Sequence, residues 1–317
     1  MPLRPDRVAL NAIQWTNVKA DPADPDSEDV WLYGEPSFVA DYPRVLGEIA
    51  RAGFDAVMME VLATQTLQSF ARMIDDAGLR LAPGYVQIGL PEDEGHDIVP
   101  GTAAWVHWFD LVRRRAEESN YFGLSTVFLS APMLWSPPSR TVSQVAVGAD
   151  FDPARLARIT DLLGEAATVL KAEGVHAGLH NHIGSWIETE AEIDYVLDQI
   201  EPSLLGASFD VGHLEWAGIE AAPMLRRYSS RLLDLHVKDL DLQVAARSRR
   251  EPGPYRYWAD RRLFLEPGLG DVDLDAVLDA IPADFPGWMI IEVDRASMDP
   301  FESALVTRRW LDAHIPH

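Results

Sequence analysis

Strand-like and helix-like segments alternate eight times along the 317 residues of this chain. Such alternation predicts a parallel sheet with helices outside it. Eight repeats predict an α/β fold, a (β/α)8 TIM barrel with extended loops at its C-terminal face, formed as a single domain over residues 1–317. The expected strands cover residues 7–15, 54–61, 79–88, 124–131, 175–183, 204–211, 232–238 and 288–294. The expected helices cover residues 36–52, 64–76, 103–119, 153–173, 189–200, 219–229, 271–280 and 300–313.

Polar side chains gather in the C-terminal halves of these strands, where a TIM barrel carries its chemistry. A strand buried on both faces is apolar nearly throughout, so polar residues at alternate positions need another explanation. In the last two expected strands the even positions become polar while the odd positions stay apolar. Alternate residues share one face of a strand, which predicts that the polar set points into the barrel mouth. The set comprises Glu60, His180, His182, Asp210, His236, Lys238, Glu292 and Asp294.

Three of these residues end consecutive predicted strands and suit a divalent cation. Asp210, His236 and Glu292 offer oxygen and nitrogen donors of the kind that bind Mg²⁺, Mn²⁺ or a related ion. Two alternatives stay open: His236 as a hydrogen-bonded core histidine, and Asp210 as a cap for the loop that follows it. Glu292 follows three apolar residues and would be costly to bury without a partner, which favours a metal or a base beside it.

Three residues at or after the end of the fifth predicted strand are candidates for the fourth metal ligand. Glu188 is the first choice, and His180 and His182 compete with it. The alternative for Glu188 is that it only precedes Thr189, which we expect to cap the next helix in a capping box with Glu192.

The remaining polar residues are candidates for catalysis or substrate binding. His182, His180 or Glu60 is expected to act as the base. Lys238 would neutralise developing negative charge or hold a substrate oxygen, and its alternative is an ion pair with Asp210 or Asp239. For Glu60 the alternative is an ion pair with a neighbouring basic residue. The expected substrate contacts are His213, Trp15, Trp186 and Asp294.

Charge and composition exclude several classes of function. The net charge of −23 repels the phosphate backbone of nucleic acids. Cysteine is absent, which removes disulfides, thiol catalysis and cysteine-type zinc sites. The first residues form no apolar signal core, and no segment reaches the roughly 18 apolar residues of a membrane span. We therefore expect a cytoplasmic protein without a nucleic-acid or membrane partner.

Aromatic and arginine-rich segments surround the predicted mouth. Most of the ten tryptophans fall at or just after strand ends, where aromatic faces stack on sugars or aryl groups and exclude water; core packing of the loops is the alternative. A loop inserted at residues 239–270, after the seventh strand, carries six arginines. It is interpreted as a lid over an anionic or extended substrate or as a subunit interface, with a solvated loop paired to local acids as the alternative.

At these residues the chain resembles the xylose-isomerase-like TIM-barrel superfamily of sugar phosphate isomerases and epimerases, over nearly its whole length. The resemblance rests on residues 53–60, 180–182, 209–213, 236–239, 268–273 and 287–292. Within the superfamily, residues 180–184 with Glu188, the long insert, and residues 287–294 look like the myo-inosose dehydratase branch and the similar α subunits of C-glycoside-cleaving enzymes.

The resemblance implies one divalent metal held by carboxylates from strands five, six and eight and by a histidine from strand seven. Carried over to this chain, the ligands are Glu188, Asp210, His236 and Glu292. Many members place the strand-five glutamate on the strand itself, whereas this chain has histidines there. Mn²⁺ is the expected ion, with Mg²⁺, Co²⁺ and Zn²⁺ as alternatives.

The resemblance also implies proton removal next to the carbonyl of a keto-sugar or keto-glycoside. We favour a lyase, acting by dehydration or by deglycosylation through β-elimination. The alternatives are an aldose–ketose isomerase or epimerase for a sugar or sugar phosphate, a non-catalytic sugar-binding barrel, and a phosphodiesterase or nuclease with several metals. The expected partners are a small carbohydrate, with an aryl group as an option, and further copies of this chain; a small partner subunit on the inserted loop is a further option.

Overall fold

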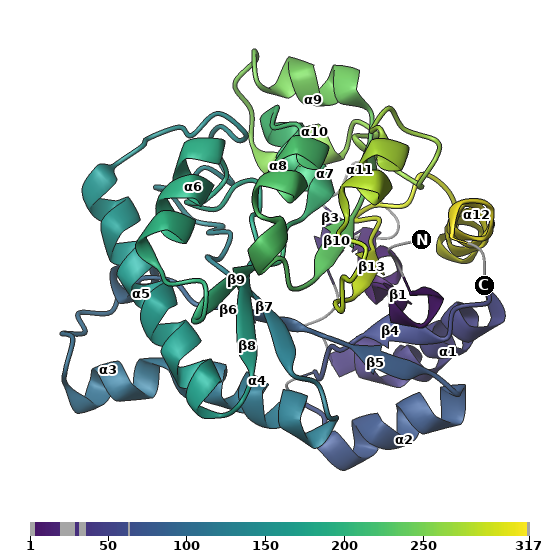
Figure 1. The fold of residues 1–317 in the computed structure, drawn as a ribbon, viewed down its shortest axis with the longest axis horizontal. Helices are drawn as coiled ribbons and strands as arrows, with labels where there is room; N and C mark the ends of the chain where they lie inside the picture. The colour runs from purple at the N-terminus through teal and green to yellow at the C-terminus, as the bar shows by residue number, and fades with distance from the viewer. Residues whose placement is uncertain (1–3, 20–28, 32–35, 63, 316–317) are drawn as a thin grey trace.

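The computed structural model describes residues 4–19, 29–31, 36–62 and 64–315, and it places parallel strands in the centre with helices around them (Figure 1). The central strands are β1 (Val8–Leu10), β4 (Ala56–Met58), β5 (Arg80–Ala82), β6 (Tyr85–Gln87), β7 (Thr126–Ser130), β8 (His176–Leu179), β9 (Leu205–Ala207), β10 (Leu235–Val237) and β13 (Met289–Ile291). The outer helices are α1 (Pro36–Arg51), α2 (Leu67–Ala77), α4 (Asp110–Tyr121), α5 (Pro153–Ala172), α6 (Glu190–Gln199), α8 (Ala221–Arg227), α11 (Leu274–Ala280) and α12 (Pro300–His314).

Two parallel sheets make up the central ring. One has the order β10-β13-β1-β4-β5 and the other β6-β7-β8-β9. At one junction β5 and β6 are consecutive parts of one strand, interrupted only by Pro83 and Gly84. At the other junction the Leu233 amide donates to the Ala207 carbonyl at 2.8 Å, and the His236 amide donates to the Phe209 carbonyl at 2.9 Å. The predicted α/β TIM-barrel fold is therefore confirmed.

Side chains alternate between an inner core and an outer core, as the strand period requires. Ile290 packs inside the ring with residues such as Phe128 and Trp288. Its neighbours Met289 and Ile291 pack outside the ring, in the large core shared with the helices. Glu292 and Asp294 have the same parity as Ile290, which places them on the inner side, as predicted.

The connections contain more regular structure than the sequence indicated. The sixth strand ends at Ala207 rather than Val211. Helix α7 (Val211–Ala217) begins after three intervening residues, at Val211, where the Asp210 side chain caps it. The segment predicted as a loop over residues 239–270 holds two short strands and two helices. They are β11 (Asp239–Leu240), α9 (Leu242–Ser248), α10 (Tyr255–Ala259) and β12 (Phe264–Leu265). Elsewhere, α3 (Ala103–Trp108) is separate from α4, and β2 (Asn17–Lys19) pairs antiparallel with β3 (Asp29–Trp31).

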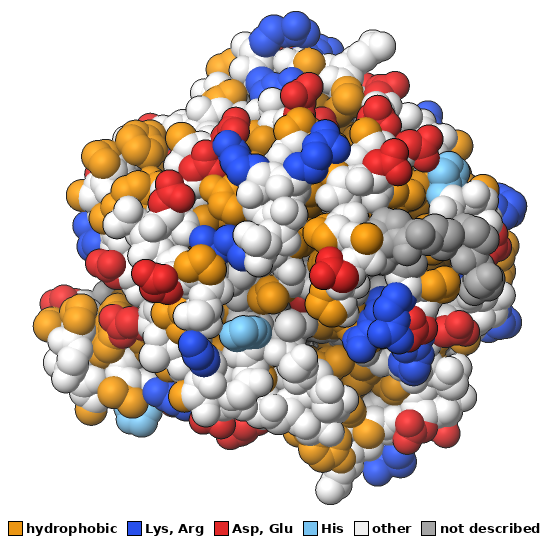
Figure 2. All heavy atoms as spheres, in the orientation of Figure 1, with side chains coloured by type: hydrophobic (Ala, Val, Ile, Leu, Met, Phe, Trp, Pro, Cys, Tyr) orange, Lys and Arg blue, Asp and Glu red, His pale blue; other side chains and the backbone are white. Residues whose placement is uncertain are grey.

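The surface has a mixed charge pattern. On the face in Figure 2, acidic, basic and apolar side chains are interspersed rather than gathered into a continuous basic surface. Within the described ranges, every helix is too short or too polar to cross a bilayer.

Candidate metal centre and active site

Three neighbouring strand ends bring Asp210, His236 and Glu292 together. Asp210 follows β9, His236 lies on β10 and Glu292 follows β13, so adjacent positions in the ring converge on one point. His236 Nδ1 lies 3.8 Å from Asp210 Oδ2 and in direct contact with Glu292 Oε2. All three residues are at most 2% exposed. Such burial makes unneutralised carboxylates costly, so the cluster needs positive charge.

The two carboxylate oxygens of Asp210 have different surroundings. Oδ1 accepts the His213 amide at 3.0 Å and caps α7. The Asp210 backbone is held by Asn181, whose side chain bonds both its amide and its carbonyl group. Oδ2 is left facing the cluster. The loop-capping interpretation is therefore confirmed for Oδ1, and the metal-site interpretation stays a prediction for Oδ2.

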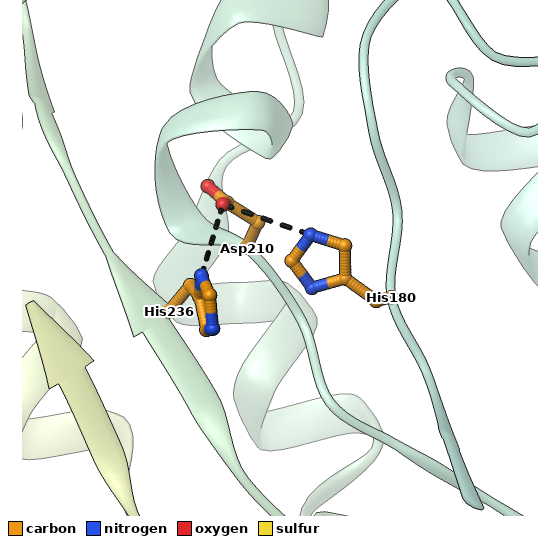
Figure 3. A group of neighbouring side chains, drawn as sticks. All are labelled: His180, Asp210 and His236. Carbon is orange, nitrogen blue, oxygen red and sulfur yellow. Dashed lines mark ion pairs between the residues drawn. The ribbon is translucent and has the colours of Figure 1, made fainter. Parts of the chain in front are cut away.

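His180 joins the cluster directly after β8. Its Nε2 lies 3.9 Å from Asp210 Oδ2, and Figure 3 shows the His180 and His236 rings directed toward the Asp210 carboxylate. The His180 Nδ1 lies 3.2 Å from the Ser208 carbonyl. A carbonyl only accepts, so Nδ1 carries the proton and Nε2 presents its lone pair to the cluster.

Lys238 places an ammonium group among the carboxylates. Its Nζ lies 3.0 Å from Asp210, 3.4 Å from Glu292 and 2.7 Å from Asp294. Burial by itself lowers the pKa of Lys238, but these three carboxylates raise it overall, so the side chain stays charged. Formally, three carboxylates and one ammonium leave two negative charges, which one divalent cation would neutralise.

The acids respond differently to this environment. Burial raises the pKa of Asp210, and Lys238 opposes the increase. Burial likewise raises the pKa of Asp294, to about 7. For Glu292, burial acts in the same direction, but Lys238 and His236 outweigh it and hold the pKa well below its usual range. Glu292 is therefore the carboxylate most firmly held in its charged form.

A second group of side chains adjoins the first. His182, His213 and Asp294 offer ligand atoms that all lie within 4.8 Å of one another. Lys238 Nζ lies 3.1 Å from His213 Nε2, and the Tyr255 hydroxyl donates to Asp294 at 2.9 Å. His182 Nδ1 lies 2.8 Å from the Ile183 carbonyl, so its Nε2 carries the lone pair. Burial lowers the pKa of His182 to about 3, which keeps the ring neutral at pH 7.

Two tyrosines of the site were not among the predicted site residues. The Tyr85 hydroxyl, from β6, lies 2.7 Å from His180 Nε2 and 3.3 Å from His236 Nδ1. Tyr255, from α10, comes from the inserted segment and stacks beside His182. The available signal for Tyr85 was its position in the third predicted strand, in the same ring of strand ends. For Tyr255 the signal was only its place among the aromatic residues that gather at and after the strand ends, in a segment interpreted as a loop.

Glu188 lies outside the cluster, contrary to its first-choice position as a metal ligand. Its carboxylate accepts the backbone amides of Gly184 at 2.8 Å, Gly148 at 2.9 Å and Ala146 at 3.1 Å. Arg140 lies 3.9 Å away. The carboxylate thus ties together the loops that follow β7 and β8, and this structure brings His180, not Glu188, to Asp210.

Glu60, Trp15 and Trp186 have partners other than the cluster. Glu60 forms an ion pair with Arg115 of α4 at 3.4 Å. The Trp15 indole donates to Glu48 of α1 at 2.7 Å. Trp186 packs beneath the guanidinium groups of Arg140 and Arg155. The alternative interpretations, ion pairing for Glu60 and packing for the tryptophans, describe these contacts.

The donor set fits a divalent cation. Asp210 Oδ2 lies within ion-pair distance of four nitrogens, yet no described residue donates a well-directed hydrogen bond to it. Glu292 Oε2, which contacts His236 Nδ1, likewise receives no well-directed hydrogen bond from these residues. Buried polar atoms of this kind are normally satisfied, and two carboxylates with imidazole nitrogen are donors for first-row divalent ions.

Comparison with known sequences agrees with the fold. The sequence model of the xylose isomerase-like TIM barrel family matches residues 46–314. The chain is 25% identical over 324 residues to an inosose dehydratase of Geobacillus kaustophilus, with 99% of this chain and 96% of that protein covered. It is 32% identical over 162 residues to an inosose dehydratase of Lacticaseibacillus casei, covering 50% of this chain and 53% of that protein.

Solved structures show the same fold. An L-ribulose 3-epimerase superposes with a TM-score of 0.63 at 16% identity, with 97% of this chain and 94% of the other covered. A probable 3-DHS dehydratase of Bacillus anthracis superposes with a TM-score of 0.62 at 12% identity, covering 96% and 98%. A zinc-bound IOLI protein gives a TM-score of 0.62 at 13% identity, covering 98% and 100%.

Proposed function

Because the chain belongs to the xylose isomerase-like TIM barrel family, we propose that it is a divalent-metal-dependent lyase that dehydrates a cyclic keto-polyol of the inosose class. The observation that carries the proposal is the cluster of Asp210, His236 and Glu292, with Lys238 beside it. The inosose dehydratase relatives support elimination over isomerisation. Loss of an aryl or sugar group from a keto-glycoside is the same chemistry with a larger leaving group.

The metal would be held by Asp210, His236 and Glu292. When bound, it supplies a Lewis acid that polarises the substrate carbonyl and makes the neighbouring C–H bond more acidic. Lys238 adds a fixed positive charge near the same oxygen, where negative charge develops as the proton leaves.

His182 is the base that the geometry favours. It is neutral, its Nε2 is unprotonated, and it is partly exposed, whereas His180, His213 and His236 are buried. The α C–H bond breaks and its proton passes to His182 Nε2. The electron pair left on carbon forms a double bond to the β carbon as the C–O bond there breaks. The departing oxygen takes up the proton that His182 received and leaves as water, which returns His182 to its neutral form.

The test is exchange of the α proton in D₂O, followed by NMR on inososes, keto-sugars and 3-keto-glycosides, with the metal removed by chelator or restored. Restored protein is expected to exchange the proton and release water, and chelated protein to do neither. Asp210→Asn and Glu292→Gln should abolish exchange and metal content together. Asp284→Asn, at an exposed position, is the matched control.

The outcomes separate the candidate functions. Exchange with an epimeric or isomeric product would replace the lyase by an epimerase or isomerase. Absence of exchange on every substrate, in protein shown to hold metal, would refute the proposal in favour of a non-catalytic or hydrolytic role.

A further inference from the structure

We infer that His180 is the fourth metal ligand, and that the resulting pair of imidazoles and pair of carboxylates tunes this site toward later first-row ions such as Co²⁺ and Zn²⁺ relative to Mn²⁺. The inference rests on the proposed metal dependence. It departs from the ligand set of three carboxylates and one histidine that the sequence resemblance implied.

The position of His180 is fixed by contacts on opposite sides of its ring. Nδ1 faces the Ser208 carbonyl at 3.2 Å. Nε2 accepts the Tyr85 hydroxyl at 2.7 Å and lies 3.9 Å from Asp210 Oδ2, so a bound metal would take the lone pair that Tyr85 now occupies. A backbone carbonyl that binds the far nitrogen is the usual orienting partner of a metal-ligating histidine. Ser208 lies only two residues before Asp210, so one short stretch of chain both orients His180 and supplies the neighbouring carboxylate.

Glu188 is held in place by three hydrogen-bond donors, and it would have to lose these hydrogen bonds to reach the cluster. Its oxygens accept amides from Gly184, Ala146 and Gly148. Hydrogen bonds to a carboxylate are among the strong ones in proteins. Moving this carboxylate would leave the amides of two loops without an acceptor at a buried position.

His182 lies two residues after His180 but belongs to the other group. The centroid of its ring lies 3.8 Å from that of His213. Its potential ligand atom lies within 4.8 Å of those of His213 and Asp294. His180 groups instead with Asp210 and His236. The two histidines of the same strand end are thus distinguishable, and each serves as the control for the other.

Donor chemistry sets the direction of the selectivity. Imidazole suits Zn²⁺, Cu²⁺, Fe²⁺ and Ni²⁺, whereas carboxylate and water suit Mg²⁺ and Mn²⁺. Almost any such site binds Zn²⁺ more tightly than Mn²⁺, so the absolute order decides nothing. The diagnostic quantity is how the ratio of Zn²⁺ to Mn²⁺ affinity changes when the His180 imidazole is replaced by a carboxylate.

The first measurement counts nitrogen ligands in the wild-type chain. Pulsed EPR of the Mn²⁺-loaded protein should show couplings to two directly bound nitrogens, and His180→Gln should reduce them to one. His182→Gln should leave two. Competition titrations should then show that His180→Glu lowers the Zn²⁺/Mn²⁺ affinity ratio by about tenfold or more, while His182→Glu changes it by less than about twofold.

One nitrogen in the wild type, or loss of a nitrogen in His182→Gln instead of His180→Gln, would overturn the inference. Failure to bind any divalent ion would overturn it too. The number of bound nitrogens is measured in the wild-type protein, so the inference can be refuted even if a substituted protein misfolds. Two bound nitrogens without any proton exchange would leave this inference standing and refute only the proposed function.

Discussion

Replacing Lys238 by methionine tests whether the ammonium and the metal neutralise the same carboxylates. Methionine keeps much of the side-chain volume and removes the charge that lies 2.7–3.4 Å from Asp210, Glu292 and Asp294. Breaking a buried ion pair by removing one partner costs about 3–5 kcal/mol. Unfolding entropy of about 2.1 cal/mol/K per residue gives about 0.7 kcal/mol/K for 317 residues. The melting temperature without metal should therefore fall by about 4–7 °C.

A divalent cation should largely restore stability, because it supplies positive charge to the same oxygens. The assay is thermal unfolding of wild-type and Lys238→Met protein in chelator and again with saturating Co²⁺ or Zn²⁺. The difference in melting temperature between the two proteins should be large in chelator and small with metal. Lys171→Met is the control, since Lys171 is exposed on α5 and bonds only the Ser203 carbonyl among described residues. If Lys238→Met and the wild type have the same melting temperature in chelator, the ammonium does not stabilise the carboxylate cluster.

Three further predictions follow from the contacts. Asp239→Ala removes the acceptor of the Gly268, Gly270 and Val272 amides and should lower the unfolding free energy by about 3–5 kcal/mol in urea titrations. Tyr85→Phe removes the hydroxyl bonded to His180 Nε2 and should tighten Co²⁺ binding about fivefold by calorimetry. Burial raises the pKa of Asp234 to about 6, so its stabilising effect is complete below the unfolded value near 4 and is lost as pH rises through 6. The unfolding free energy of Asp234→Asn relative to that of the wild type should therefore rise by up to about 3 kcal/mol when the pH is raised from 4 to 8. Denaturant unfolding of both proteins at both pH values measures this change.

Each of these has an outcome that counts against it. Unchanged urea stability of Asp239→Ala would mean that its loop amides find other acceptors. Weaker Co²⁺ binding by Tyr85→Phe would make the phenol a ligand rather than a competitor for His180. A constant stability difference between Asp234→Asn and the wild type across pH would mean that Asp234 titrates normally in the folded chain.

Local periodicity and local chemistry determined much of this protein. The alternation of apolar and polar positions around residues 235–238 and 289–294 is a property of each strand alone, so it predicted the inner-facing acids correctly. The Thr189–Glu192 capping box spans three residues and was also predictable, and it is present at the start of α6. Asp210, His236 and Glu292 meet because each ends its own strand and parallel strands share one edge of the ring.

Contacts between loops were decided only by the tertiary structure. Glu188 was a reasonable ligand by spacing, yet its oxygens are taken by amides about 40 positions earlier in the chain, at Ala146 and Gly148. Tyr255 enters the site because its own amide bonds the Thr141 carbonyl of another loop. No local pattern encodes such pairings, because each depends on where a distant backbone segment passes. A strand's parity can be determined from its own residues, whereas the partner of a buried carboxylate depends on how the whole chain packs.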